Sequence, residues 1–202
     1  MTKTIIAIVG TYRKGGVIDT AVNEILRAAK DAGAQTSKIY LIDKHIEFCT
    51  NCRTCMQQPG PTKGSCRHND DMAGILDQVD FADGLVLASP VNFYNVTAVT
   101  RRFMERLAVY GYWPWGQGAP KFRIAKSGKK ALLVTSSAAP AFIGKIFYRP
   151  ALTALKGIAQ CFGAKVIAKL YLGMVAQQPD STFDKKDFLR AYSAGLKLAQ
   201  SI

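Results

Sequence analysis

The feature of this sequence that most constrains its fold is the regular alternation of short apolar runs with longer amphipathic segments. The apolar runs are rich in β-branched residues and predict strands at Thr4–Val9, Thr36–Ile42, Gly84–Ala88, Lys130–Thr135 and Lys165–Leu172. Apolar residues at helical spacing predict helices ending before Gly33 and spanning Met72–Val79, Val96–Tyr110, Pro150–Phe162 and Lys185–Ala199. Strands that are apolar throughout are buried on both faces, which predicts a parallel sheet covered by helices on each side.

Strand–helix units repeated along 202 residues predict an α/β fold, namely a flavodoxin-like, doubly wound, five-stranded parallel sheet in a three-layer αβα sandwich. We expect a single domain over residues 1–202, with a cysteine-rich insertion at 46–68 and an aromatic and basic excursion at 111–128. In such sheets the ligand lies at the carboxyl ends of the strands, beside the point where the strand order reverses. The loops after the first, third and fourth strands are therefore the candidate binding loops.

The charge balance favours an anionic ligand or partner. Lys and Arg number 27 against 14 Asp and Glu, a net charge of +13 that attracts phosphorylated cofactors, nucleic acid, anionic membrane or an acidic protein. A basic surface that serves only solubility is the plain alternative. No nucleic-acid-binding module appears and the basic residues are scattered, so we expect no nucleic acid partner. The N-terminal apolar run is too short for a signal peptide and no stretch could span a membrane, so we expect a cytoplasmic protein without membrane insertion.

The loop after the first strand, Gly10–Gly16, is suited to bind a phosphate. It runs from a strand through glycines into a helix, which presents unpaired backbone N–H groups and the positive end of the helix dipole. Thr11 adds a hydroxyl and Arg13 a charged fork. The glycine spacing fits neither a Walker A loop nor a dinucleotide-binding fingerprint. A basic turn without a ligand is the alternative.

The loop after the third strand, Ser89–Val96, is suited to bind a flat ring. Pro90 fixes the exit from the strand, and Phe93 and Tyr94 follow on the connection. Such a loop can offer backbone N–H groups to the edge of a ring system and aromatic surface to its side. The alternative is an ordinary connection, but exposed aromatic residues usually indicate binding.

These motifs together resemble those of the NAD(P)H-dependent FMN reductase family. The run Gly-Thr-Tyr-Arg-Lys-Gly-Gly resembles the family's phosphate loop. The Cys-x-x-Cys-x-x-Cys segment and Ser-Pro-Val-Asn-Phe-Tyr resemble its multimeric-flavodoxin and iron–sulfur flavoprotein branch. The resemblance implies an oxidoreductase that binds FMN, takes hydride from NAD(P)H and reduces a small acceptor such as a quinone or free flavin. It also implies a homodimer or homotetramer.

By this resemblance three loops hold the cofactor. The phosphate loop supplies Thr11, Arg13, Gly15, Gly16, Val17 and Ile18, the isoalloxazine loop supplies Pro90, Val91, Asn92, Phe93 and Tyr94, and a third loop supplies Ser136, Ser137 and Ala138. Val17 and Ile18 stand where this branch often has Asn and Thr, so either the loop is longer or backbone N–H groups replace those side chains. A carboxylate facing a phosphate is repulsive, so we expect Asp19 to point away.

No catalytic side chain is predicted, because the flavin itself carries the hydride chemistry. We expect His45 and His68 to lie on the solvated cysteine loop rather than to transfer protons.

Four of the five cysteines form a candidate metal site. Cys49, Cys52 and Cys55 have ferredoxin-like spacing, with Cys66 as a fourth thiolate, and predict a [4Fe–4S] cluster as one alternative. An irregular zinc site that includes a histidine is the second and free thiols are the third. The long gap before Cys66 favours free thiols. With a cluster, the protein would be an iron–sulfur flavoprotein that passes electrons between FMN, the cluster and a protein partner. We expect Cys161 in the core.

The segment Tyr110–Gly116 contains both tryptophans, at Trp113 and Trp115. It predicts either a hydrophobic plug between subunits or a stacking wall on the substrate side of a flavin. The basic run from Lys121 to Lys130 that follows indicates recognition of the 2′-phosphate of NADPH, docking of an acidic redox protein, or a merely solvated hairpin.

Overall fold

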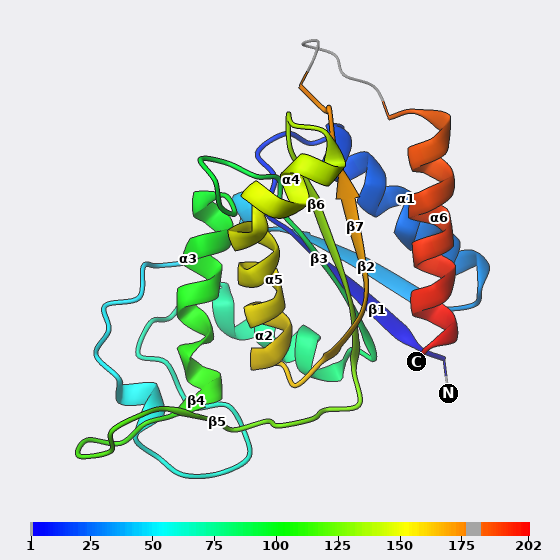
Figure 1. The fold of residues 1–202 in the computed structure, drawn as a ribbon. Helices are drawn as coiled ribbons and strands as arrows, with labels where there is room; N and C mark the ends of the chain where they lie inside the picture. Colours follow the sequence, from blue (N-terminus) through cyan, green and yellow to red (C-terminus); the bar gives the residue numbers. More distant parts are fainter. Residues whose placement is uncertain (1, 177–182) are drawn as a thin grey trace.

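The computed structural model describes residues 2–176 and 183–202 and is built around a five-stranded parallel sheet in the order β2-β1-β3-β6-β7 (Figure 1). All four pairings in this sheet are parallel. The strands are β1 (Thr4–Val9), β2 (Gln35–Tyr40), β3 (Gly84–Ala88), β6 (Lys130–Ser136) and β7 (Lys165–Leu172). The predicted flavodoxin-like fold is confirmed.

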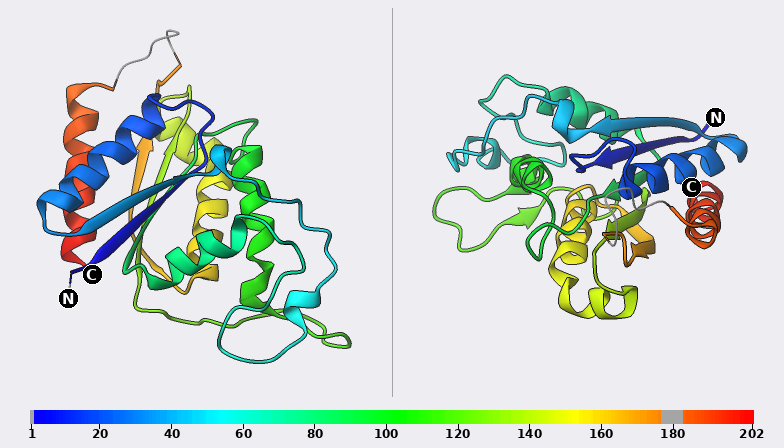
Figure 2. Two further views of the ribbon diagram at one scale, coloured as in Figure 1. Left: turned by 180° about the vertical axis from the view of Figure 1, so that it is seen from behind. Right: turned by 90° about the horizontal axis from the view of Figure 1, so that it is seen from above.

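Helices cover both faces of the sheet. They are α1 (Val17–Asp31), α2 (Met72–Phe81), α3 (Ala98–Arg106), α4 (Ala141–Phe147), α5 (Arg149–Cys161) and α6 (Lys185–Gln200). The view from above shows α1 and α6 on one face and α2, α3 and α5 on the other (Figure 2). A separate buried apolar cluster lies between the sheet and the helices on each of its faces, so the molecule has the three predicted layers. Within the described ranges, no helix has the length and apolar character needed to cross a membrane.

Some element boundaries and two small elements differ from the prediction. The second strand ends at Tyr40, where a 3₁₀ turn Leu41–Asp43 begins, and α3 gives way to a 3₁₀ turn at Leu107–Tyr110. That tighter turn carries the fully buried Tyr110 into the core, where its hydroxyl donates to Asp80. Helix α4 and the hairpin of β4 (Gly111–Tyr112) and β5 (Lys121–Phe122) were not predicted, because elements this short show no periodicity.

The order of the strands decides where a ligand can bind. Strand β3 pairs with β1 on one side and with β6 on the other, all running in the same direction. The loops that follow β1, β3 and β6 therefore leave the sheet at one edge and lie side by side. This edge is the upper one in Figure 1, where α4 also lies.

Candidate functional site

Hydrogen bonds join the three loops at the carboxyl edge of the sheet. The hydroxyl of Thr97 donates to the carbonyl oxygen of Gly10 at 2.6 Å. The N–H of Val91 donates to the carbonyl oxygen of Ser136 at 2.8 Å. Each bond links two loops that are far apart in the sequence. The structure therefore brings the predicted phosphate, isoalloxazine and third-loop residues together at one edge.

Close backbone packing holds the first loop against α3. A Cβ atom on Gly10 would lie 1.7 Å from the hydroxyl oxygen of Thr100, so this position requires glycine. Thr97 caps α3, since its side chain also accepts from the N–H of Thr100. The beginning of α3 is thus fixed directly against the end of β1.

The phosphate-loop residues surround the beginning of α1. Thr11 is buried, and its hydroxyl accepts from the N–H of Arg13 at 3.2 Å. Helix α1 begins at Val17, with Gly16 as an N-cap that has no side chain to offer. The N–H groups of Val17 and Ile18 belong to the first helical turn, which has no intrahelical acceptors for them. This helix end can bind an anion through backbone donors and its dipole.

Asp19 has a different role from the one expected. Its buried carboxylate accepts from Lys38 Nζ and the Tyr40 hydroxyl, each at 2.7 Å. The same carboxylate accepts from the N–H of Gly15 at 2.7 Å. Burial raises the pKa of Asp19, but hydrogen bonds from Gly15, Lys38 and Tyr40 outweigh it and hold the pKa below its usual value. Asp19 therefore faces Lys38 and Tyr40 of β2, but contrary to the expectation it also contacts the loop, where it accepts the N–H of Gly15.

The isoalloxazine loop contains a strained turn. Asn92 and Asn95 exchange two backbone hydrogen bonds, and the residues between them have positive φ angles, 44° at Phe93 and 66° at Tyr94. Side chains with a Cβ rarely adopt this region. The turn exposes Phe93 almost completely, at 97%, and Tyr94 at 63%. The loop thus presents two aromatic rings at the edge where the three loops meet.

The third loop is held by β7. Ser136 and Ser137 are buried and Ala138 is exposed. The N–H of Ser137 donates to the carbonyl oxygen of Leu172 at 3.0 Å, and its hydroxyl accepts from Tyr171 at 2.8 Å. Ser137 is therefore fixed by its contacts with β7, whereas Ala138 is exposed to solvent.

The four clustered cysteines are free, half-buried thiols. Burial, together with the nearby thiols of Cys66, Cys49 and Cys52, raises the pKa of Cys55 to about 11. The four thiols therefore lie in one region. Across residues 2–176 and 183–202, however, no three His, Cys, Asp or Glu side chains are placed to hold a metal ion. The residues as arranged do not fit an iron–sulfur cluster, so we assign no chemical step to iron and the metal site stays a prediction.

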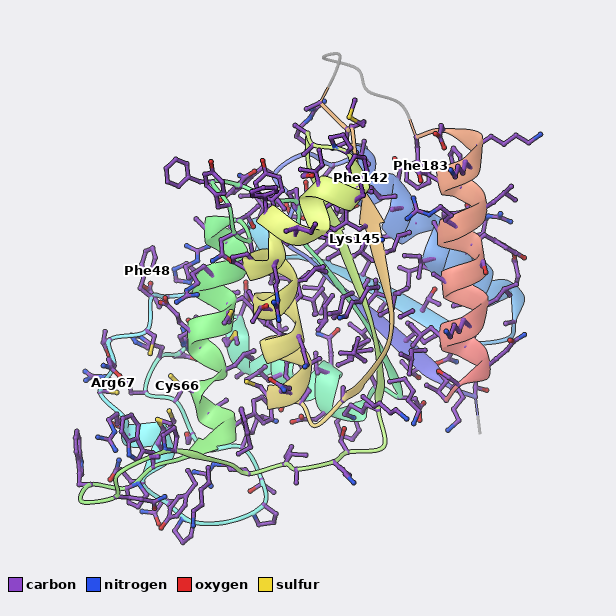
Figure 3. All side chains as sticks on the ribbon, viewed as in Figure 1. Phe48, Cys66, Arg67, Phe142, Lys145 and Phe183 are labelled. Carbon is purple, nitrogen blue, oxygen red and sulfur yellow. The ribbon has the colours of Figure 1, made fainter. Side chains whose placement is uncertain are left out.

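Cys66 contacts a buried ion pair between α3 and the start of α2. Arg106 pairs with Asp70 at 2.5 Å and donates to Cys66 Sγ at 3.4 Å. Burial lowers the pKa of Arg106, but the Asp70 carboxylate and Cys66 together outweigh it, so the pKa is raised. Figure 3 shows Cys66 beside the lower part of α3, whereas the labelled Phe142 and Lys145 lie at the upper edge with α4. Most of the length of α3 thus separates this thiol from the three loops.

The two histidines differ. His45 is exposed as expected and lies 3.0 Å from Glu47. His68, expected on a solvated loop, instead lines a cavity of about 260 Å³ together with Cys66 and Arg106. Its Nε2 atom is buried without a hydrogen-bond partner among the residues that the structure describes. Cys161 is half-buried and packs against the core, with its pKa raised by burial to about 11.

The aromatic excursion binds the cysteine loop of its own chain. The Arg53 guanidinium lies 3.8 Å from the ring centroid of Trp113 and 4.2 Å from that of Trp115. Arg53 also donates to the Trp113 carbonyl oxygen at 2.6 Å. On the other side of the hairpin, Arg123 donates to the carbonyl oxygen of Cys55 at 3.1 Å. Sequence reasoning missed these contacts, because they join residues that are 60 and 68 positions apart in the sequence.

The basic run lies far from the three loops. Lys130 begins β6 and Ser136 ends it, so at about 3.3 Å per residue they are about 20 Å apart. Lys129 Nζ donates to the carbonyl oxygens of Asp80 and Ala82, each at 2.7 Å, and so caps the end of α2. Arg123 binds the cysteine loop. The interpretation that this run recognises the 2′-phosphate of NADPH stays a prediction, and the run ends at the edge of the sheet opposite the three loops.

Comparison with known proteins identifies relatives over most of the chain. A family model described as NADPH-dependent FMN reductase matches residues 3–171. An iron–sulfur flavoprotein of Archaeoglobus fulgidus is 34% identical over 113 residues, which cover 56% of this chain and 49% of that protein. One from Methanocaldococcus jannaschii is 35% identical over 102 residues, which cover 50% of each chain. The chain thus spans about half the length of the curated relatives it matches.

Solved structures share the fold at low sequence identity. An NAD(P)H:quinone oxidoreductase from Methanothermobacter marburgensis has a TM-score of 0.72 at 15% identity, covering 98% of this chain and 96% of that one. An FMN-dependent NADH-azoreductase from Bacillus anthracis, in complex with FMN, has a TM-score of 0.68 at 13% identity, covering 98% of both chains.

Proposed function

This chain belongs to the NADPH-dependent FMN reductase family, and on that premise we propose that it binds FMN at the carboxyl edge of its sheet. We propose further that it takes hydride from NAD(P)H and reduces a small acceptor such as a quinone or free flavin. The observation that carries this proposal is the joining of the three predicted loops by the Thr97–Gly10 and Val91–Ser136 hydrogen bonds. Bound FMN would supply the hydride chemistry, and the protein supplies binding and orientation.

The residues at this edge fit the parts of FMN. The first-turn N–H groups of Val17 and Ile18 suit the phosphate, as does the exposed Arg13. In the loop Pro90–Tyr94 the N–H groups of Val91 and Asn92 are used within the protein, which leaves those of Phe93 and Tyr94, together with exposed aromatic surface, for a ring system. Ser136–Ala138 borders the same edge. Gly15 does not serve as a phosphate donor in this proposal, because Asp19 accepts its N–H.

A proline substitution tests the phosphate site without disturbing the helix. Val17 is the first residue of α1, a position that tolerates proline, and Gly16 before it is extended with ψ 178°. Val17→Pro therefore removes one N–H group and leaves the helix intact. Since one hydrogen bond to a charged group contributes about 1.5 kcal/mol, FMN should bind about tenfold more weakly.

Quenching of flavin fluorescence measures both FMN and riboflavin affinity. Riboflavin lacks the phosphate, so its affinity should be the same in wild type and Val17→Pro. Wild-type protein loaded with FMN should also lose its flavin absorbance on anaerobic addition of NADPH. Equal loss of affinity for both flavins would place the phosphate elsewhere, and a protein that binds neither flavin would refute the proposed function.

A second candidate function includes an iron–sulfur cluster. The matched relatives named iron–sulfur flavoproteins make a cluster-containing protein the second candidate, although the four thiols as arranged do not fit a cluster. Iron and sulfide analysis of anaerobically purified protein separates the flavin-only enzyme from the cluster-containing protein, and for the flavin-only enzyme we expect neither iron nor sulfide.

We also propose a homodimer or homotetramer. The exposed Phe142, Ile146 and Phe147 on α4 support this proposal, and light scattering measures the oligomeric state.

A further inference from the structure

The strained turn of the isoalloxazine loop places an aromatic ring where a second ring meets it. Phe93 and Tyr94 are consecutive residues with positive φ, although neither is a glycine. Backbone of this kind persists where the surroundings fix it, and it is concentrated at binding and catalytic sites. Here it directs Tyr94 toward the end of α4, where the ring centroids of Tyr94 and Tyr148 lie 5.5 Å apart.

Tyr148 is fixed in turn by the third loop. It joins α4 to α5, with its N–H donating to Gly144 and its carbonyl oxygen accepting from Ala151. A Cβ atom on Gly144 would lie 2.2 Å from the hydroxyl oxygen of Tyr171, so α4 packs directly on that ring. The same hydroxyl donates to Ser137 at 2.8 Å. The contacts Ser137–Tyr171–Gly144 therefore position Tyr148 relative to a loop that we propose borders the flavin.

The two tyrosine rings can receive a third ring. Their planes are tilted by 52°, so the rings are not stacked face to face and each keeps apolar surface outside the contact. Tyr94 is 63% exposed. Aromatic rings bind other flat rings through stacked or edge-to-face contacts, with a preference over compact, hydrated ions.

We infer that Tyr94 and Tyr148 form an aromatic gate that selects flat aromatic electron acceptors over other oxidants. Tyr148 is then a specificity-determining residue. This inference rests on the proposed function, because it needs the flavin to lie at the same edge. In the selected reaction, NAD(P)H and a proton reduce a quinone to a hydroquinone, and NAD(P)⁺ is released. With ferricyanide, NAD(P)H reduces two ions to ferrocyanide and releases NAD(P)⁺ and a proton.

Steady-state kinetics of Tyr148→Ala with two acceptors tests the gate. The probes are 1,4-naphthoquinone, which is flat and aromatic, and ferricyanide, which is neither. One aromatic contact corresponds to roughly a 2- to 10-fold change in binding. We expect kcat/KM for naphthoquinone, divided by kcat/KM for ferricyanide, to fall by roughly that factor, mainly through a higher KM for the quinone. Tyr148→Phe keeps the ring and should keep the wild-type ratio.

Phe81→Ala is the matched control, because Phe81 is an exposed aromatic residue at the end of α2, whereas the ring contacts of Tyr94 are with Phe93 and Tyr148. It should leave the ratio unchanged. FMN per chain and size-exclusion elution are measured for every variant. An unchanged ratio in an FMN-loaded, active Tyr148→Ala enzyme would overturn the gate while leaving the proposed function intact. If Tyr148→Ala lowers kcat/KM equally for both acceptors and elutes as a smaller particle, Tyr148 lies at a subunit contact and the gate is overturned. Wild type without NAD(P)H oxidation would refute the proposed function itself.

Discussion

At the scale of single residues, unfavourable backbone geometry is concentrated in the segments that approach the site or the cysteines. Among the described residues other than glycine, positive φ angles occur at Asn51, Arg53, Phe93, Tyr94 and Met174. Asn51 and Arg53 lie between the clustered cysteines, and Phe93 and Tyr94 form the exposed turn. Such angles cost about 1–2 kcal/mol at each residue that has a Cβ. These angles therefore lower the free energy of unfolding, and in return they orient a few side chains.

A pair of substitutions at Tyr94 isolates this backbone cost. Tyr94→Gly and Tyr94→Ala remove the same ring, so they differ mainly in how well the new residue tolerates a φ of 66°. At ordinary positions alanine is more favourable than glycine by about 0.5–1 kcal/mol. Here we expect the reverse, with Tyr94→Gly more stable than Tyr94→Ala by about 1 kcal/mol in urea unfolding. A Tyr94→Ala variant as stable as Tyr94→Gly would show that the turn is not strained.

At the scale of elements, the aromatic hairpin and the cysteine loop stabilise each other. Neither has the length or apolar content to fold alone, since β4 and β5 have two residues each. The N–H of Trp113 donates to the carbonyl oxygen of Met56, and the side chain of Gln57 accepts from the N–H of Trp115. With the Arg53 guanidinium close to both indole rings, these contacts hold the loop against the hairpin.

Replacing Arg53 should loosen the cysteine loop. Arg53→Ala removes both cation–π contacts and the hydrogen bond to Trp113. We expect tryptophan emission to shift to longer wavelength, because the chain's two tryptophans both contact Arg53. We also expect the half-buried Cys55 to react several-fold faster with a thiol reagent, as its burial and raised pKa are relaxed.

The control for this experiment is Arg101→Ala. Arg101 pairs with Glu105 on the exposed side of α3, so its removal should leave both signals unchanged. If Arg53→Ala also leaves both unchanged, the hairpin does not hold the loop.

Long elements were predictable from the sequence and tertiary contacts were not. The five parallel strands follow from local apolar runs, and the three loops follow from the rule that ligands bind at the strands' carboxyl ends. The engagement of Gly15 by Asp19 depends on Lys38 and Tyr40, which β2 brings in from another part of the chain. The contact between Tyr94 and Tyr148 depends on α4, a helix too short to show a periodic signal. Side-chain pairs that join distant segments leave no local pattern to detect.

At the scale of the whole molecule, the chain carries a large positive charge, and a few of its carboxylates form ion pairs and hydrogen bonds within the fold. The chain has 27 Lys and Arg but only 14 Asp and Glu. Asp70 is buried against Arg106, while Asp83 accepts from the Thr4 N–H and pairs with Lys3. Burial raises the pKa of Asp19 and of Asp70, but hydrogen-bond partners outweigh it and hold both pKa values below 3.8. The Thr4 hydrogen bond is the main cause of the lowered pKa of Asp83.

These shifts predict a protein that is sensitive to acid. A carboxyl group whose pKa is lower in the folded state stabilises the fold fully above its unfolded pKa, near 3.8. That stability is lost as the pH falls through the lower folded value. Over the same range the other carboxylates lose their charge, so repulsion among the basic residues is no longer opposed. We therefore expect the urea midpoint to be flat from pH 7 to about pH 5 and to fall steeply below about pH 4.

Salt and one substitution separate the two causes of this acid sensitivity. Molar salt screens general repulsion between exposed charges, so it should recover part of the stability lost at pH 3. It should not recover the part that comes from the buried pair, because Asp70 and Arg106 are only 1% and 2% exposed. Asp70→Asn should be destabilised at pH 7 by roughly 3 kcal/mol, since it leaves the Arg106 charge buried without its partner. Its loss of stability between pH 5 and pH 3 should be smaller than that of wild type. If salt restores wild type completely and Asp70→Asn follows the same pH curve, then repulsion alone causes acid unfolding and the buried pair contributes nothing to it.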